Sequence, residues 1–225
     1  MKITQLLEGK PFMTEFGIVG YSTVVLIQED GKNILFDTGN KSQALQLKSA
    51  LKELGLDCSD ISDVVLSHLH FDHVGNVPLF CNASFSLSMT EWVSATGNPD
   101  EWHSVPVCDY LRRNGNLNFV KEGDQISSSV AVMELAGHTM GLIGLKCGAN
   151  TILCSDAIKN RFELWQNIPL MSVDPKQSQR TIERIRNEAY FIYPGHDKVL
   201  EVGKPICDEA IHFTVRYANG QEVQL

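Results

Sequence analysis

The 225-residue sequence predicts an α/β protein in which sheets are covered by helices. Short runs rich in β-branched residues recur along the chain, and such runs are typical of buried strands. Segments whose apolar residues have helical spacing lie between these runs. Because no repeat, low-complexity tract or linker divides the sequence, we expect residues 1–225 to form a single domain.

The first half of the chain contains a predicted hairpin followed by a helix. The strands of the hairpin are residues 23–27 and 33–36, which flank a turn sequence at 30–32. Apolar positions in residues 43–54 have helical spacing, and Gly55 stands where a helix commonly ends. We therefore expect this helix to stop before Gly55.

Strand and helix signals alternate through the rest of the chain. Residues 83–117 are interrupted by Gly and Pro, so we expect helical pieces and loops there. Residues 175–189 predict a helix with Pro175 in its first turn. The remaining predicted strands are residues 61–67, 130–135, 142–147, 151–154 and 190–193, with a terminal hairpin formed by residues 212–217 and 221–223.

Composition excludes several classes of protein. Hydrophobic residues make up 43% and charged residues 20% of the chain, so disorder, collagen and coiled coils fit poorly. The 19 basic and 27 acidic side chains give a net charge of −8, which disfavours nucleic-acid binding. No apolar run approaches the roughly 20 residues of a membrane helix, and the N-terminal apolar stretch is too short for a signal peptide. We expect a soluble, cytoplasmic protein that does not bind membranes.

The six cysteines lie far apart and include no Cys-x-x-Cys pair, so neither a zinc knuckle nor a redox dithiol is predicted. We expect them to be reduced, as is usual for a cytoplasmic protein. Cys154 lies within a predicted strand and should be a small core residue.

The densest chemical signal directly follows the predicted strand 61–67. Four side chains able to bind a metal fall within six residues: His68, His70, Asp72 and His73. Three more follow later strands: His138, Asp156 and His196. Imidazole nitrogens and carboxylate oxygens are ligands of Zn²⁺ and related divalent metals. A surface loop of solvated histidines does not explain this recurrence at strand ends, so the sequence predicts a metal site.

Together these motifs resemble the metallo-β-lactamase superfamily of metallohydrolases. The motifs, in order, are His68-x-His70-x-Asp72-His73, Gly137-His138-Thr139, Ser155-Asp156-Ala157 and Pro194-Gly195-His196-Asp197. The resemblance covers about residues 20 to 200 and implies a four-layer αββα sandwich with the site at one edge. In the family pattern one metal would be held by His68, His70 and His138, a second by Asp72, His73 and His196, and both would be bridged by Asp156.

A pair of metals has a clear chemical use. Two divalent ions about 3.5–4 Å apart can share a water and lower its pKa toward about 7, which gives a metal-bound hydroxide. We expect two divalent metal ions, with zinc favoured and manganese or iron also compatible with the ligands. Redox di-iron members of the superfamily usually carry an acidic residue at the position of His70, so histidine here favours hydrolysis. Asp72 is the expected catalytic residue, because the family pattern has it bind the second metal and pass a proton to the leaving group.

Asp37 lies in an Asp-Thr-Gly sequence, which has three interpretations. An aspartic protease needs two such carboxylates, and this chain has one Asp-Thr-Gly. A simple turn residue is the second interpretation. The superfamily resemblance implies a third, an aspartate that orients a ligand histidine, and we favour this role. His103 and His212 lie outside the motifs and are expected to be structural.

Within the superfamily, the motifs are most similar to those of N-acyl-homoserine lactonases. Those lactonases carry a tyrosine three residues after the bridging aspartate, whereas this chain has Lys159. Lys159 would polarise a carbonyl or bind a carboxylate of the substrate, and an exposed loop lysine is an equal alternative. We expect a small-molecule substrate whose ester, lactone or thioester carbonyl is hydrolysed.

Aromatic side chains follow the bridging aspartate closely. We expect a loop to carry Phe162 and Trp165 over the mouth of the site, where they would pack on an acyl chain of the substrate. An equal alternative is that both only fill the core, since Phe and Trp are core residues by default.

Two other functions stay open at this point. A phosphodiesterase or ribonuclease of the same superfamily would use the two metals for phosphoryl displacement, although the acidic charge weighs against nucleic acid. A non-catalytic ligand sensor would keep the fold, but loss of metal ligands would mark such a protein and none is lost here. The sequence is also compatible with a homodimer.

Overall fold

The computed structural model of the chain describes residues 1–11, 13–14, 17–18, 20–114, 116–204, 214–216 and 222–224. Most of its strands belong to two six-stranded sheets. The first sheet contains β1 (Lys2–Leu7), β4 (Val24–Glu29), β5 (Lys32–Phe36), β6 (Asp63–Val65), β7 (Ser84–Ser88) and β8 (Leu117–Val120), in that spatial order. The second contains, in spatial order, β14 (Leu200–Glu201), β13 (Phe191–Pro194), β12 (Thr151–Ser155), β11 (Ile143–Cys147), β10 (Val130–Glu134) and β9 (Gln125–Ser127). Two short antiparallel pairs complete the strands: β2 (Met13–Thr14) with β3 (Gly17–Ile18), and β15 (Thr214–Arg216) with β16 (Glu222–Gln224).

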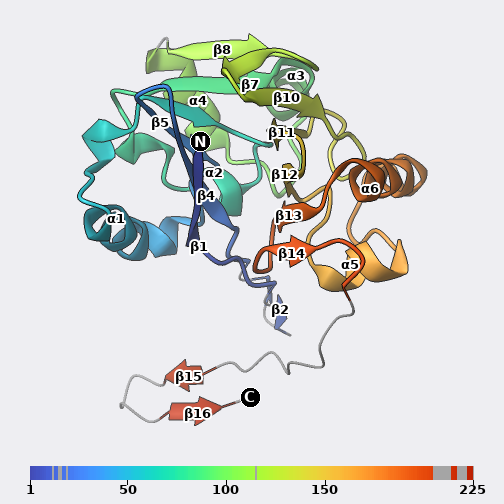
Figure 1. Cartoon of the computed structure of the whole chain (residues 1–225). Helices are drawn as coiled ribbons and strands as arrows, with labels where there is room; N and C mark the ends of the chain where they lie inside the picture. The colour runs from blue at the N-terminus through green and yellow to red at the C-terminus, as the bar shows by residue number, and fades with distance from the viewer. Residues whose placement is uncertain are drawn as a thin grey trace.

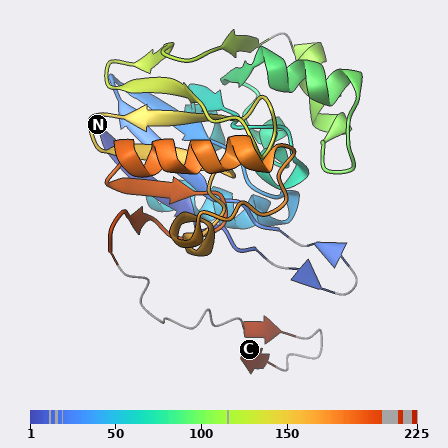
Figure 2. The ribbon, with the colours of Figure 1, turned by 90° about the vertical axis from the view of Figure 1, so that its right-hand side faces the viewer.

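Helices cover the outer faces of both sheets. Figure 1 shows α1 on the left and α6 on the right, and in Figure 2 α6 crosses in front of the second sheet. The helices are α1 (Ala44–Glu53), α2 (Phe71–Val74), α3 (Met89–Gly97), α4 (Val105–Asn114), α5 (Arg161–Gln166) and α6 (Pro175–Glu188). Single 3₁₀ turns are η1 (Lys41–Gln43), η2 (Cys58–Asp60) and η3 (Val77–Leu79). Within the described residues, no helix is both long and apolar enough to cross a membrane.

Alternation along the central strands builds three separate cores. Because successive side chains of a strand point to opposite faces, Leu26 of β4 packs with α1, whereas Ile27 packs between the two sheets. Ile182 and Ile185 of α6 close a third core on the outer face of the second sheet. Helix, sheet, sheet and helix therefore stack in four layers, and the expected αββα sandwich is confirmed. Each such fully buried side chain contributes about 1.5–3 kcal/mol of burial free energy.

Most elements of the first half form as predicted. β4 and β5 pair as an antiparallel hairpin, and both residues of its turn, Asp30 and Gly31, have positive φ angles, 53° and 74°. Paired left-handed residues match the twist of hairpin strands. α1 stops before Gly55, whose φ of 74° is the left-handed conformation that ends helices. The predicted strand 61–67 is shorter in the structure, where β6 comprises only Asp63–Val65.

The prediction for residues 83–117 was incomplete, because this segment also contains β7 and the start of β8. Serines alternate with buried Phe85 and Leu87 in β7, a period of two that the Gly and Pro residues further along obscured. β1 and β9 were also not predicted. The strands of the predicted terminal hairpin pair as β15 and β16, while the turn between them and His212 lie outside the described residues.

Candidate metal centre

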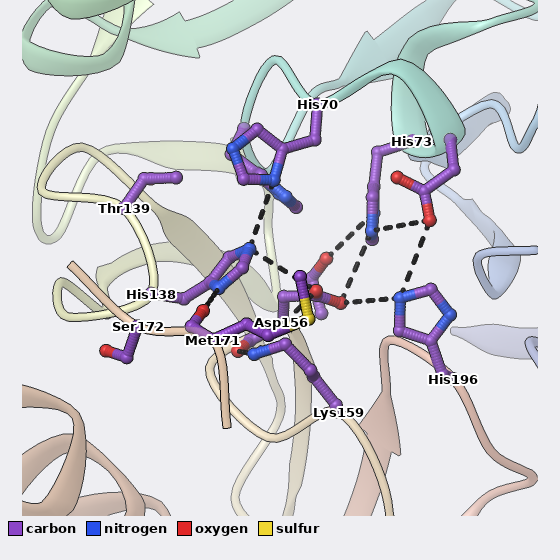
Figure 3. A network of polar contacts seen from close by, with 12 residues as sticks. His70, His73, His138, Thr139, Asp156, Lys159, Met171, Ser172 and His196 are labelled. Atoms are coloured by element: carbon purple, nitrogen blue, oxygen red, sulfur yellow. Dashed lines mark hydrogen bonds and ion pairs between the residues drawn. The ribbon is translucent and has the colours of Figure 1, made fainter. Parts of the chain in front are cut away.

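The predicted ligands lie where two pairs of parallel strands end. β5 runs parallel to β6, and β12 runs parallel to β13, so the carboxyl ends of each pair lie at the same edge of their sheet. The histidine-rich segment follows β6, Asp156 follows β12 and His196 follows β13. His138 comes from the turn between β10 and β11. Figure 3 shows these side chains converging from separate loops.

All seven predicted metal ligands come together, six of them in two groups of three and Asp156 between the groups. Within each group the ligand atoms lie within 4.8 Å of one another; the groups are His68, His70 and His138, and Asp72, His73 and His196. Asp156 lies between the groups, with Oδ2 3.4 Å from Nε2 of His138 and Oδ1 3.3 Å from Nε2 of both His73 and His196. The position of Asp156 is the one that a bridging carboxylate requires.

Several buried atoms of these groups lack a hydrogen-bond partner among the described residues. They are Nε2 of His68, His70 and His73 and Oδ1 of Asp156. Burying a polar atom without a partner costs about 1–3 kcal/mol, so such atoms call for a ligand. Imidazole nitrogens and a carboxylate oxygen that converge in this way have the donor chemistry of a divalent metal site. The residues present therefore fit the metals that the sequence predicts.

The second ring nitrogen of three histidines is held by a fixed acceptor. Nδ1 of His73 donates to Oδ2 of Asp37 at 2.8 Å, and Nδ1 of His138 donates to the carbonyl of Met171 at 2.7 Å. Nδ1 of His196 donates to the carbonyl of Tyr21 at 3.0 Å. Each bond selects the tautomer and turns Nε2 toward the centre, as is usual for metal-binding histidines.

Asp37 connects the loops of the two sheets. Its fully buried carboxylate accepts bonds from the N–H and hydroxyl of Ser67, both at 2.8 Å, and from the hydroxyl of Ser155 at 2.9 Å. Asp37 and Ser155 both have left-handed backbones, with φ of 58° and 48°. Such strain in residues other than glycine is concentrated at functional sites. Its bond to His73 agrees with the predicted role of Asp37, which is to orient a ligand histidine.

The electrostatics of the two ligand groups differ. Burial alone would lower the pKa of His73 and of His196, but the carboxylates of Asp156 and Asp72 outweigh it and raise both, so these two imidazoles release a proton when they bind a metal. Burial lowers the pKa of His68 and of His138 well below the usual value, so both imidazoles are neutral at physiological pH. Burial alone would raise the pKa of Asp156, but the imidazoles of His196 and His73 outweigh it and hold that pKa well below its usual range. Asp156 is therefore an ionised carboxylate.

Close approach of two loops at Asp156 requires a glycine. A Cβ atom at Gly195 would overlap Oδ1 of Asp156, so only glycine lets the loop carrying His196 pass this closely. Steric contact with Asp156 thus explains why glycine precedes His196 in the Pro194-Gly195-His196 sequence.

A cavity of about 470 Å³ opens beside the two ligand groups. This volume lies within the range of about 300–1,000 Å³ that is usual for small-molecule sites. Asp72, Asp156 and Lys159 reach the cavity as polar groups. Its apolar lining consists of Pro11, Phe71, Trp102, Met171 and Val173.

Lys159 is buried in this lining and is not an exposed loop lysine. It is 8% exposed, and its ammonium lies 4.0 Å from Oδ2 of Asp156 and 3.6 Å from Oε1 of Glu163. Figure 3 shows its side chain beside Asp156. A positive charge is thus available next to the predicted bridging carboxylate.

The residues predicted to cover the site mouth are arranged differently from the expectation. They lie on the short helix α5 and not on a loop, because the Asn160 side chain accepts the N–H groups of Phe162 and Glu163 and so starts a helix. Phe162 is 47% and Trp165 67% exposed, so neither fills the core. Neither belongs to the described lining of the cavity, and their contact with substrate stays a prediction.

Two residues beside the site were not predicted. Trp102 lines the cavity, with its ring stacked near Phe71 at a centroid distance of 6.3 Å. Glu91 is fully buried behind the histidines. The only sequence signal for Glu91 is the Ser-x-x-Glu pattern of a helix start at Ser88, which does not show where its carboxylate lies. His103, expected to be structural, packs its ring against His70 at 5.3 Å.

A four-layer αββα sandwich with paired histidine and aspartate groups at its strand ends defines a class of metal-dependent hydrolases. In agreement, the model of the Metallo-beta-lactamase superfamily matches residues 17–196. This chain therefore belongs to the metallo-β-lactamase superfamily, and the predicted class, a metal-dependent hydrolase, is confirmed.

The sequence identity to individual relatives is low. A probable metallo-hydrolase from Methanocaldococcus jannaschii is 28% identical over 168 residues, which cover 74% of this chain and 72% of the relative. An N-acyl homoserine lactonase from Bacillus thuringiensis is 24% identical over 160 residues, which cover 68% of this chain and 62% of the relative. The match therefore spans less than two thirds of that lactonase.

Among solved structures, a variant of AiiA from Bacillus thuringiensis with N-decanoyl-L-homoserine bound at the active site is similar, with a TM-score of 0.69. The alignment covers 87% of this chain and 92% of that one at 18% identity. At this identity the similarity shows the fold alone.

Proposed function

We propose that this chain is a dinuclear-metal-dependent hydrolase of small molecules that contain a lactone, ester or thioester. The observation that supports this most strongly is the cavity, which lies directly against Asp72, Asp156 and at least one histidine of each ligand group: His70 and His138 of one, and His196 of the other. The lactonases among the relatives point to the same kind of substrate. Zinc is the proposed metal, and a cytoplasmic location agrees with the free cysteines of the described residues.

The histidines and aspartates would divide between two metals as the family pattern has them, with Asp156 shared. When bound, a pair of divalent metals lowers the pKa of water and polarises a carbonyl oxygen. The chain itself supplies the orientation of the ligands through Asp37 and the carbonyls of Met171 and Tyr21. Because these partners are fixed before substrate arrives, the ligands need little rearrangement.

Asp72 is proposed to move the proton. Its Oδ2 lies 3.6 Å from Nε2 of His196 and 3.9 Å from Nε2 of His73, so this oxygen faces the ligand group. Oδ1 is then the oxygen that takes a proton from the attacking water and returns it to the leaving alkoxide or thiolate. Asp72 is 8% exposed and lines the cavity, so it can reach the scissile bond without being fully solvated.

Lys159 and the apolar lining are proposed to bind the substrate. The Lys159 ammonium would donate to the carbonyl oxygen or to a carboxylate of the substrate, at the position where the lactonases that this sequence resembles carry a tyrosine. Trp102 would pack on the acyl chain within the cavity. Met171 and Val173, which line the cavity and are 50% and 65% exposed, would extend this apolar surface outward. Phe162 and Trp165 on α5 are proposed to contact the far end of a long acyl chain.

The test is a substrate panel on the metal-loaded protein. It includes homoserine lactones of short and long acyl length, an acyl thioester, an aryl ester and bis-p-nitrophenyl phosphate. We expect hydrolysis of carbonyl substrates that is lost on chelation, restored by Zn²⁺ and absent in His196→Asn. Turnover of the phosphodiester without any carbonyl substrate would identify a phosphodiesterase instead. A metal-loaded protein inert toward the whole panel would favour a ligand sensor.

A further inference from the structure

A buried carboxylate that the proposed mechanism does not use lies behind the three-histidine group of His68, His70 and His138. Glu91, the third residue of α3, has no exposed surface. Burying a charged carboxylate is costly unless hydrogen bonds compensate it, so its contacts indicate why it is present.

Each carboxylate oxygen of Glu91 binds a different ligand loop. Oε1 accepts the N–H of Leu69 at 3.0 Å, and Oε2 accepts the hydroxyl of Thr139 at 2.7 Å. Leu69 lies between two ligand histidines, His68 and His70, and Thr139 directly follows the third. One side chain thus connects the two segments that supply the whole three-histidine group.

The first turn of α3 fixes the position of this carboxylate. The Ser88 hydroxyl accepts the N–H of Glu91 at 3.0 Å and donates to the carbonyl of Gly141 at 2.6 Å. A Cβ atom at Gly141 would overlap the backbone of Glu91, so the helix start and the loop carrying His138 are in direct contact. Glu91 therefore has little freedom to move relative to either loop.

His103 adds a second contact to the same group. Its Nε2 lies 3.6 Å from Oε1 of Glu91, and its ring meets the ring of His70 edge-on, at 5.3 Å and 78°. His70 is thus supported from the side that faces Glu91. The other ligand group is anchored differently, through Asp37 and the carbonyl of Tyr21.

We infer that Glu91 is a positioning residue that sets the separation of His68 and His70 from His138 and so determines the metal affinity of the three-histidine group. The inference rests on the proposed dinuclear centre. The effect should be larger at this group than at the other, because the Glu91 carboxylate binds directly beside its histidines, at Leu69 and Thr139, and binds none of Asp72, His73 and His196. Loss of an outer partner of metal ligands typically weakens metal binding about 10- to 100-fold.

The experiment titrates the metal-free full chain with Co²⁺ and follows its visible spectrum, which reports ligand geometry as well as occupancy. His138→Asn and His196→Asn identify which phase of the titration belongs to which group. Glu91→Gln keeps the size of the side chain but leaves one acceptor where two are needed. We expect it to weaken the three-histidine phase about 10- to 100-fold, to alter that spectrum and to weaken the other phase by a clearly smaller factor.

Two further variants keep the inference falsifiable. Thr139→Val removes one donor and should weaken the same phase by a smaller factor, and it decides the question if Glu91→Gln does not fold. The effects of the two substitutions should not be additive, because both alter the contact between Glu91 and Thr139. Ile185→Val, in the core beneath α6, is a control that lowers stability without moving either phase.

The possible failures are distinguishable. A parent chain that does not bind two Co²⁺ ions would contradict the proposed dinuclear centre. A parent chain that binds two, combined with a Glu91→Gln variant whose two phases are both unchanged or equally weakened, would overturn the inference about Glu91 alone.

Discussion

At the scale of single residues, one substitution tests the two roles proposed for Asp72, which are to bind a metal and to move a proton. Asp72→Asn keeps the shape of the side chain but removes a metal-binding oxygen and the proton acceptor. General acid–base catalysis is worth about 10²–10⁴-fold, so we expect kcat to fall by at least that order on any substrate found. Steady-state kinetics and metal analysis of the same sample provide the measurement. Asp109→Asn, on the exposed surface of α4, is the matched control and should keep the parental rate. Nearly full activity with unchanged metal content would show that Asp72 has neither role.

Candidate metal ligands could be chosen from sequence because coordination chemistry allows few residue types, and the structure brings them together, while their binding of metal stays a prediction. Histidine and aspartate at successive strand ends have no common structural reason to recur, so His138 and His196 were identified although they lie far from His68. Glu91 and Trp102 offered no such signal. A glutamate in the first turn of a helix is ordinary, and its importance depends on the loop that packs against it, which sequence does not reveal.

At the scale of elements, two tryptophans test different parts of the proposed binding surface. Trp102 lines the cavity, whereas Trp165 lies on the exposed face of α5. Trp102→Ala should lower kcat/KM for short and long acyl chains alike. Trp165→Ala should raise KM for long chains only, with little change in melting temperature. Burial of about 1.5–3 kcal/mol corresponds to roughly a ten- to hundredfold loss in kcat/KM. Equal losses on short and long chains in Trp165→Ala would remove α5 from the binding surface.

The attachment of α6 to the second sheet should depend on pH. Arg184 pairs with Glu122 at 2.7 Å and with Glu188 at 3.0 Å. Burial alone would raise the pKa of Glu122, but its bonds with Arg184 and with the N–H of Glu134 outweigh burial and lower that pKa. Because the folded pKa lies below the unfolded value, the stabilisation is present above about pH 4.5 and is lost as the pH falls through the folded pKa.

Arg184→Ala should therefore lower the free energy of unfolding at pH 7 by about 0.2–1 kcal/mol per exposed pair, and the deficit should shrink toward pH 3. Denaturant unfolding at both pH values measures it. Arg180→Ala is the control on the same helix, since Arg180 binds the neutral Gln177 and its effect should not vary with pH. A deficit for Arg184→Ala that stays constant down to pH 3 would contradict the assignment.

Elements with strong local periodicity were predictable, and elements defined by their partners were not. α6 has apolar residues such as Ile182 and Ile185 at helical spacing and a proline in its first turn, so it was predicted within one residue. β1 is only partly buried along its length, so its sequence lacks a clear apolar pattern, and pairing with β4 makes it a strand. The start of α5 depends on one N-cap residue, Asn160. A short polar segment gives too little pattern to predict a helix from that residue alone.

At the scale of the whole molecule, the candidate metal centre lies between the two sheets. Its ligands come from loops of both, so metals bound there should stabilise the packed sandwich and not merely one loop. We expect close to two transition-metal ions per chain by elemental analysis. Chelation should lower the melting temperature by roughly 5–15 °C, given metal at 100 to 1,000 times its dissociation constant. A well-folded, metal-free sample that cannot be reconstituted would contradict the dinuclear centre.

The contacts of the His196 loop have a consequence for biosynthesis. His196 is turned toward the centre by the carbonyl of Tyr21, and the amide of Gln5 binds the carbonyl of the neighbouring Asp197, so the end of the second sheet closes on the beginning of the first. The ribosome synthesises the N-terminus first. The contacts of Gln5 and Tyr21 with residues 196–197 therefore form late, because both partners must have emerged. His68, His70 and His138 all emerge well before His196. On the proposed assignment, the group of Asp72, His73 and His196 can therefore be complete only after nearly the whole chain has been synthesised and the His196 loop has packed against Tyr21.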